Sequence, residues 1–127
     1  RDVDAVAQWL EREAARPDLA LCSSAVRTRE TLEIVSRRFP GLGGTIVDGL
    51  YLASLSELVA ALGRADPAAS RVLLVGHNPG LSALVAWLDP DVRPPVAMAP
   101  AGLAVLTLRV DGWADLAPGA AELRQRL

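Results

Sequence analysis

The sequence contains one cysteine, one histidine and no lysine, and these shortages narrow the chemistry open to it. With Cys22 as its single cysteine, the chain forms neither an internal disulfide framework nor a cysteine-rich zinc site. One histidine and scattered carboxylates give no spacing suited to metal ligands, so we expect no metal and no cofactor. All 13 basic residues are arginine, which we interpret as a codon bias that lowers the functional weight of arginine as such.

The chain also has little net charge and lacks long apolar runs. The net charge is −2 and the basic residues form no stripe, so we expect no nucleic-acid partner. The longest apolar runs fall well short of the roughly 20 residues of a membrane helix, and the first residues lack a signal-peptide pattern. We therefore expect a cytoplasmic protein with no membrane association. Its 127 residues allow one domain, residues 1–127, with its own core.

Helical periodicity and short apolar runs alternate along the first two thirds of the chain. Up to residue 75 the spacing of apolar residues predicts three helices and three strands, and Leu81, Leu84, Val85 and Leu88 predict a further helix after His77. The helices are expected over residues 2–15, 26–39 and 54–65, and the strands over 19–22, 45–51 and 72–75. Strands that alternate with helices are typical of an α/β layered domain.

The last third of the chain has a different pattern. A proline-rich loop over residues 89–100 precedes a strand over 102–110. The Asp-Gly pair at 111–112 predicts a hairpin turn, after which Trp113 opens a short partner strand. The tail from Pro118 has the composition of a helix.

The single histidine, His77, follows the strand expected at residues 72–75. That strand is continuously apolar and ends at Gly76, which predicts burial on both faces. Asn78 suits a helix N-cap and Pro79 the first helical position, so His77 lies at a strand end beside a helix N-terminus. Ligands bind at such strand ends in open α/β sheets, and helix N-termini favour anions. The alternative is a lone histidine satisfied by a backbone carbonyl.

A second strand-to-helix junction carries Ser23, Ser24, Arg27 and Arg29. Both arginines fall in the first helical turn, where a positive charge opposes the helix dipole unless an anion binds. Arg27 lies nearer the strand end, where its planar guanidinium could grip two phosphate oxygens, whereas Arg29 is expected to stay solvated. The two serines either cap the helix or donate to the same anion, and capping is the expected role.

The spacing between Cys22 and Arg27 argues against a cysteine-dependent phosphatase. Such enzymes place one more residue between nucleophile and arginine than the four found here, and the loop lacks glycines that would wrap a phosphate. We therefore expect Cys22 to be a small buried residue at a strand end.

Three segments together resemble the histidine phosphatase superfamily and, within it, the short SixA-type phosphohistidine phosphatases. They are SSAVRTRET (23–31), DGLYLAS (48–54) and VLLVGHNPGLS (72–82). The resemblance implies a phosphoglycerate-mutase-like fold, with a mostly parallel central sheet and helices on both faces. It also implies phosphoryl transfer through a phosphorylated enzyme histidine. Arg27 would be a phosphate-pocket arginine, His77 the second pocket histidine, and Ser24 a weaker phosphate-binding neighbour.

One family motif is missing from these residues. The nucleophilic histidine of the family belongs to an arginine-histidine motif after the first strand, and the chain has no such motif. We expect the motif upstream of residue 1, because Arg1 opens a helix that has no cap and because the domain would otherwise lack its central strand. The alternative is a degenerate protein without catalysis.

The resulting hypothesis is a metal-independent phosphatase acting on phosphohistidine in a protein partner, or on a small phosphorylated molecule. Asp48 is the nearest carboxylate to the position where relatives acting on phosphate esters carry a general acid, and it is a poor candidate. A phosphohistidine substrate tolerates this, because imidazole departs more readily than an alkoxide. Two alternatives are a phosphomonoesterase or mutase on small phosphate esters, and a non-catalytic phosphate-binding module if the N-terminus is natural. The sequence gives no oligomeric state.

Overall fold

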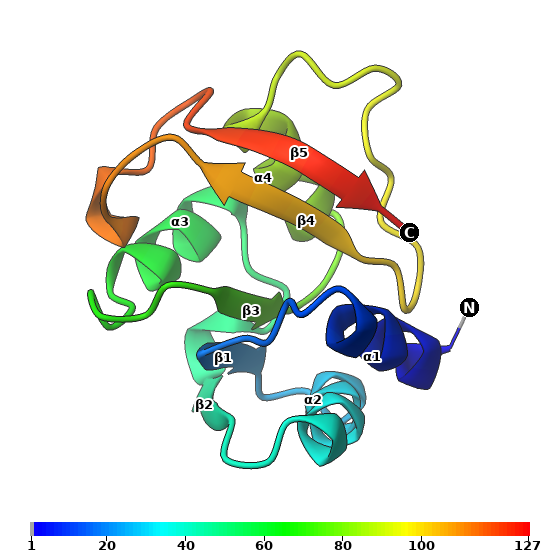
Figure 1. Cartoon of the computed structure of the whole chain (residues 1–127). Coiled ribbons are helices and arrows are strands. Elements are labelled where there is room, and N and C mark those ends of the chain that lie inside the picture. The colour runs from blue at the N-terminus through cyan, green and yellow to red at the C-terminus, as the bar shows by residue number, and fades with distance from the viewer. Residues whose placement is uncertain (1) are drawn as a thin grey trace.

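A computed structural model describes residues 2–127, whose strands form two separate small sheets. The helices and strands follow one another as α1 (Val3–Arg12), β1 (Leu19–Ser23), α2 (Val26–Arg38), β2 (Gly43–Val47), α3 (Leu55–Gly63), β3 (Val72–Val75), α4 (Gly80–Leu88), β4 (Ala104–Leu108) and β5 (Ala121–Arg126), with short 3₁₀ turns η1 (Asp48–Leu50) and η2 (Trp113–Asp115) (Figure 1). None of the helices in this described part is long and apolar enough to cross a membrane.

The first sheet is parallel, with the strand order β2-β1-β3. Its centre is β1, where residues 20–23 are all buried. The prediction that β3 is buried on both faces is wrong: Val72, Leu73 and Leu74 are only partly buried. The reason is position, because within residues 2–127 β3 pairs with β1 on one side only. A continuous apolar run does not distinguish a central strand from an edge strand.

Helices flank this sheet on both sides, as expected for an α/β domain. Ala20 and Cys22 of β1 pack with Leu32 of α2 on one face. Leu21 points to the other face, where it joins a core that includes Leu58 of α3. Alternate β1 side chains therefore contact different helices, as the two-residue repeat of a strand requires.

The prediction of a helix from Pro118 is wrong, because the tail forms strand β5. It pairs antiparallel with β4, and Leu106 lies opposite Leu123. The alanine, glutamate and arginine content favours a helix locally, but pairing with β4 and burial of Ala121 outweigh that propensity. Trp113 also differs from its prediction, since it opens the 3₁₀ turn η2 instead of a strand.

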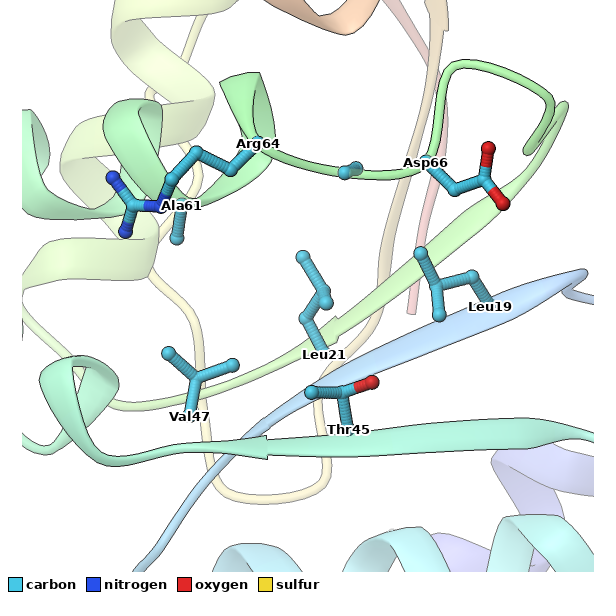
Figure 2. A pocket seen from close by; sticks show the side chains of 8 residues that line it. Leu19, Leu21, Thr45, Val47, Ala61, Arg64 and Asp66 are labelled. Atoms are coloured by element: carbon cyan, nitrogen blue, oxygen red, sulfur yellow. The ribbon is translucent and has the colours of Figure 1, made fainter.

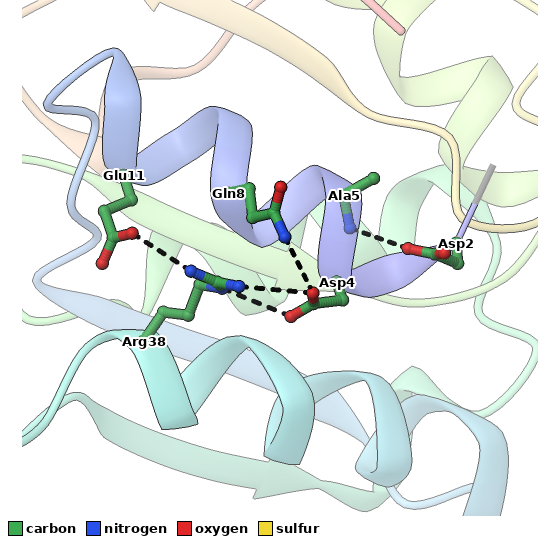
Figure 3. Close-up of polar contacts among 6 residues, drawn as sticks. All are labelled: Asp2, Asp4, Ala5, Gln8, Glu11 and Arg38. Atoms are coloured by element: carbon green, nitrogen blue, oxygen red, sulfur yellow. Dashed lines mark hydrogen bonds and ion pairs between the residues drawn. The ribbon is translucent and has the colours of Figure 1, made fainter.

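The first helix has the cap that the sequence interpretation denied it. Asp2 is itself the N-cap of α1, and its carboxylate accepts a hydrogen bond of 2.8 Å from the backbone N–H of Ala5 (Figure 3). The start of α1 therefore gives no sign of a segment upstream of it. Arg1 lies outside the described residues.

An ion-pair cluster joins α1 to α2. The Arg38 guanidinium contacts the carboxylates of Asp4 and Glu11, each at 3.2 Å (Figure 3). Behind it, Val6 and Leu10 of α1 pack against Val35 of α2. The two helices are thus joined by an apolar seam with a charged rim on the solvent side.

Candidate functional site

The candidate site begins where β1 and β3 end side by side. Cys22 and Val75 are the last paired residues of the two strands. Beyond that pair, β1 leads through Ser23 into α2. In the same way, β3 leads through His77 into α4. The structure thus confirms that His77 lies at a strand end close to a helix N-terminus, and it brings both predicted junctions to one edge of the sheet.

A hydrogen bond links the two junctions directly. The Ser23 hydroxyl oxygen lies 2.7 Å from Nε2 of His77 and also accepts the backbone N–H of Ala25 at 3.3 Å. Ser23 is fully buried, and His77 is partly buried. The sequence interpretation missed this contact, although a polar residue directly after the apolar run 19–22 was a usable signal for it.

Thr28 fixes the first turn of α2 to the end of β1. Its single hydroxyl hydrogen is shared between the carbonyl oxygens of Ser23 and Ala25, each 2.9 Å from Oγ1. The N-cap position of α2 is Ala25, which provides no side-chain cap. The capping role expected for Ser23 and Ser24 is therefore wrong, because Ser23 is turned toward His77.

Arg27 extends from this anchored turn into solvent. Within residues 2–127 its guanidinium makes no hydrogen bond or ion pair, and α2 has no acidic residue in its first turn. An unpaired cation at a helix N-terminus raises the local positive potential and suits an anionic ligand. Arg29 is exposed on the same turn. Ser24 is partly exposed, and no hydrogen bond within the described residues ties it to Arg27 or to His77.

The turn after His77 is fixed differently from the prediction. Helix α4 starts at Gly80, so Pro79 occupies the N-cap position and Asn78 precedes it. The Asn78 side chain still accepts the N–H and the hydroxyl of Ser82, at 3.2 and 2.8 Å, and its amide donates to the Met98 carbonyl. Asn78 therefore ties the site to the long loop before β4, a link that local sequence patterns did not indicate.

Gly80 allows close backbone contact at the start of α4. A Cβ at this position would lie 2.3 Å from the carbonyl oxygen of Ala53. Only glycine fits there without displacement of the backbone that follows η1.

A third segment reaches the site from the end of β2. The Tyr51 ring lies 5.5 Å from the His77 ring, centroid to centroid, and is tilted by 56°. Tyr51 and its neighbour Leu52 are 58% and 65% exposed, and Val26 at the start of α2 is 61% exposed. Tyr51 therefore places a largely exposed aromatic ring beside His77. The sequence interpretation had used Tyr51 only as part of the DGLYLAS segment.

Cys22 behaves as expected for a buried core thiol. Its side chain is fully buried, and burial raises the pKa of the thiol above its ordinary value. A raised pKa disfavours the thiolate, which is the nucleophilic form of cysteine. This supports the conclusion that Cys22 is not a nucleophile.

A separate cavity lies between the parallel sheet and α3, away from His77 and Arg27. It measures about 260 Å³ and is lined mainly by aliphatic side chains, with Arg64 and Asp66 at its rim (Figure 2). Its lining residues are Leu19, Leu21, Thr45, Val47, Ala61, Arg64, Ala65 and Asp66. None of them belongs to the site described above.

The whole fold matches solved structures of one phosphatase family. A candidate phosphohistidine phosphatase SixA from Nakamurella multipartitia superposes with a TM-score of 0.83 at 30% identity, and the match covers 98% of this chain and 78% of that one. This chain belongs to the SixA family of the histidine phosphatase superfamily. The resemblance carried by the three sequence segments is thereby confirmed.

Other SixA structures agree. A candidate SixA from Agrobacterium tumefaciens has a TM-score of 0.82 at 26% identity, with 98% of this chain and 76% of that one covered. A protein histidine phosphatase SixA complexed with tungstate shares the fold at a TM-score of 0.80 and 22% identity, with 99% of this chain and 78% of that one covered.

Two curated proteins match the sequence along nearly its whole length. Two curated Mycobacterium tuberculosis proteins, one from each of two strains and both described as uncharacterized, are 32% identical to this SixA-family chain over 132 residues. The match spans 97% of this chain and 80% of each relative. No family model matches the sequence.

Proposed function

We propose that this SixA-family chain is the larger part of a metal-independent phosphatase that hydrolyses phosphohistidine, with Arg27 and His77 binding the transferred phosphoryl group. One observation carries the proposal: Ser23 holds His77 at the same sheet edge from which the unpaired Arg27 guanidinium extends. Ser24 is a secondary candidate for phosphate contact from the same junction.

The residues suit the charge that develops in phosphoryl transfer. In the transition state, negative charge is spread over three equatorial oxygens, and catalysis consists mainly of positioning and charge stabilisation. A guanidinium can grip two of these oxygens, and the uncapped N-terminus of α2 adds backbone donors. The imidazole of His77 supplies a further ring nitrogen. These groups need no metal to perform this task.

We assign the nucleophile to a histidine upstream of residue 1. An imidazole nitrogen there would attack phosphorus while the bond from phosphorus to the substrate nitrogen breaks, and the departing imidazole would take a proton from solvent. Water would then cleave the new phosphohistidine and release inorganic phosphate. Two observations support this assignment. About a fifth of the length of the SixA structures lies outside the match, and β3 has one side unpaired within residues 2–127.

The substrate follows from the leaving group. Asp48 is the carboxylate nearest to the position expected for a general acid. It is exposed and makes no side-chain hydrogen bond in the described part of the chain. An alkoxide leaving group needs a general acid, whereas imidazole does not. Phosphohistidine, in a protein or in a small molecule, therefore fits the site better than a sugar phosphate.

The test compares substrates on the protein as its gene encodes it. Release of phosphate from a phosphohistidine peptide should exceed release from sugar phosphates and from p-nitrophenyl phosphate by at least an order of magnitude. The opposite preference would indicate a phosphomonoesterase or mutase. Phosphate binding without turnover of any of these compounds would indicate a non-catalytic binding module.

A further inference from the structure

The burial of Ser23 determines which atom donates the hydrogen bond between Ser23 and His77. A serine hydroxyl has one hydrogen to donate and two lone pairs that accept. One lone pair takes the backbone N–H of Ala25. His77 is the remaining partner of this oxygen among residues 2–127, at 2.7 Å. The direction of the bond depends on which of the two atoms carries the proton.

If Nε2 of His77 carried the proton, Ser23 would accept twice and donate to nothing. The Ser23 side chain is fully buried, so no solvent could take its hydrogen. A buried donor without an acceptor is costly, whereas donation to Nε2 satisfies every polar atom of the hydroxyl.

We propose that Ser23 is a positioning residue that holds neutral His77 as the tautomer protonated at Nδ1. In that tautomer Nε2 accepts from Ser23, and Nδ1 is left as an N–H donor. Nδ1 has no hydrogen-bond partner within the described residues, so this donor is free for a ligand. The assignment of the tautomer stands on geometry alone. The assignment of a phosphoryl oxygen as the acceptor rests on the proposed function.

The tautomer matters because a phosphoryl oxygen accepts hydrogen bonds and cannot donate them when ionised. With the opposite tautomer, Nδ1 would turn a lone pair toward the anion and repel it. Ser23 therefore converts a neutral imidazole into an anion-binding group. The ring of Tyr51 lies beside the imidazole and restricts its movement. The second serine of the junction, Ser24, makes no corresponding contact within residues 2–127.

Ring nitrogen shifts make the tautomer directly measurable. Long-range ¹H–¹⁵N spectra of the protein as its gene encodes it are recorded at alkaline pH, and the ring signals of His77 are assigned by their absence in His77→Gln. The expected pattern has an unprotonated, pyridine-type Nε2 and a protonated, pyrrole-type Nδ1. Ser23→Thr should keep this pattern, because the hydroxyl is retained, and Ser23→Ala should shift the population toward protonated Nε2.

Thr28→Val is the matched control, since it removes another buried hydroxyl of the same turn that does not touch His77. It should leave the His77 tautomer unchanged, and the backbone amide spectrum reports whether each variant is folded. A protonated Nε2 in the wild-type chain, or the same tautomer in folded Ser23→Ala, would overturn the proposal.

Inorganic phosphate tests the ligand part separately. Its addition should move the Nδ1 resonance, and Ser23→Ala should weaken phosphate affinity roughly tenfold, as expected for a lost hydrogen-bond donor. An Nδ1 resonance that does not respond to phosphate would overturn the donor role even where the tautomer is as stated. If the tautomer and the Nδ1 response to phosphate are both as expected but the wild-type protein turns over no phosphohistidine, the proposed function is wrong and the role of Ser23 stands.

Discussion

The Ser23 hydroxyl and the His77 ring connect two strand-to-helix turns that are 54 residues apart in sequence. The connection exists because β1 and β3 run parallel and their pairing ends at Cys22 and Val75. It places Nε2 of His77 against the buried hydroxyl of Ser23, in the junction that leads into the helix carrying Arg27.

Loss of either phosphate-binding side chain should reduce turnover without unfolding the protein. We expect Arg27→Ala and His77→Ala to lower kcat for phosphohistidine hydrolysis by about 10²- to 10³-fold, since each removes a group that stabilises transition-state charge. Arg27 is exposed, so Arg27→Ala should change the thermal unfolding midpoint little. His77→Ala leaves the buried Ser23 hydroxyl without its acceptor, so it should lower the midpoint moderately while the protein stays folded. Steady-state kinetics and thermal unfolding on the same preparations measure both.

Arg29→Ala is the control for this pair of variants. It removes a guanidinium from the same exposed turn, and we expect it to change kcat less than threefold or so. Full activity of folded Arg27→Ala or His77→Ala would remove that residue from the site.

Gly80→Ala should destabilise the fold, because the added methyl group would meet the backbone oxygen of Ala53 at 2.3 Å and a Leu58 methyl at 3.1 Å. Forcing atoms into a packed region costs about 1–3 kcal/mol in the free energy of unfolding. Gly49→Ala has no atom within 4 Å of its new methyl group and should change that free energy by less than about 0.5 kcal/mol. Urea unfolding of the two variants compares them, and equal stability would contradict the described packing of α4.

The pairing of Asp4 with Arg38 should make stability depend on pH in the acid range. The Arg38 hydrogen bond lowers the pKa of Asp4 below its ordinary 3.8. A carboxyl whose pKa is lower in the folded state adds stability above its unfolded pKa and loses it as the pH falls through the folded pKa. Asp4→Asn should therefore lower Tm slightly at pH 7, and the difference from wild type should vanish in strong acid.

The comparison needs a carboxylate that takes part in no ion pair. Asp111→Asn removes an exposed carboxylate with no ion pair in the described residues, and we expect it to move Tm little at any pH. A Tm difference for Asp4→Asn that persists unchanged at low pH would show that the effect is not electrostatic.

Local patterns in the sequence predicted the parts of the site that depend on neighbouring residues. The strand before His77, the helix after it and the helix carrying Arg27 are each set by a few consecutive side chains, and all three are where they were expected. The family was also predicted correctly, because two of its motifs lie where these strands lead into these helices. The roles of Arg27, His77 and Ser24 in phosphate binding remain predictions.

Features set by distant contacts could not be predicted in this way. The tail from Pro118 forms a strand because β4 lies beside it, although its own residues favour a helix. The hydroxyl of Ser23 contacts His77 because two strands end together, and the amide of Asn78 contacts Met98 because a long loop returns to the site. Each of these partners lies too far along the chain for periodicity or capping patterns to indicate it.

The most direct test of a phosphatase that works through a phosphorylated histidine is the intact mass of the natural gene product after brief incubation with phosphoramidate. The reaction is quenched at alkaline pH, where phosphohistidine survives. The account predicts a mass increase of one phosphoryl group that acid removes, together with a much smaller increase in Arg27→Ala. A folded wild-type protein that forms no adduct, under conditions in which it binds inorganic phosphate, would contradict the account and leave a phosphate-binding module in its place.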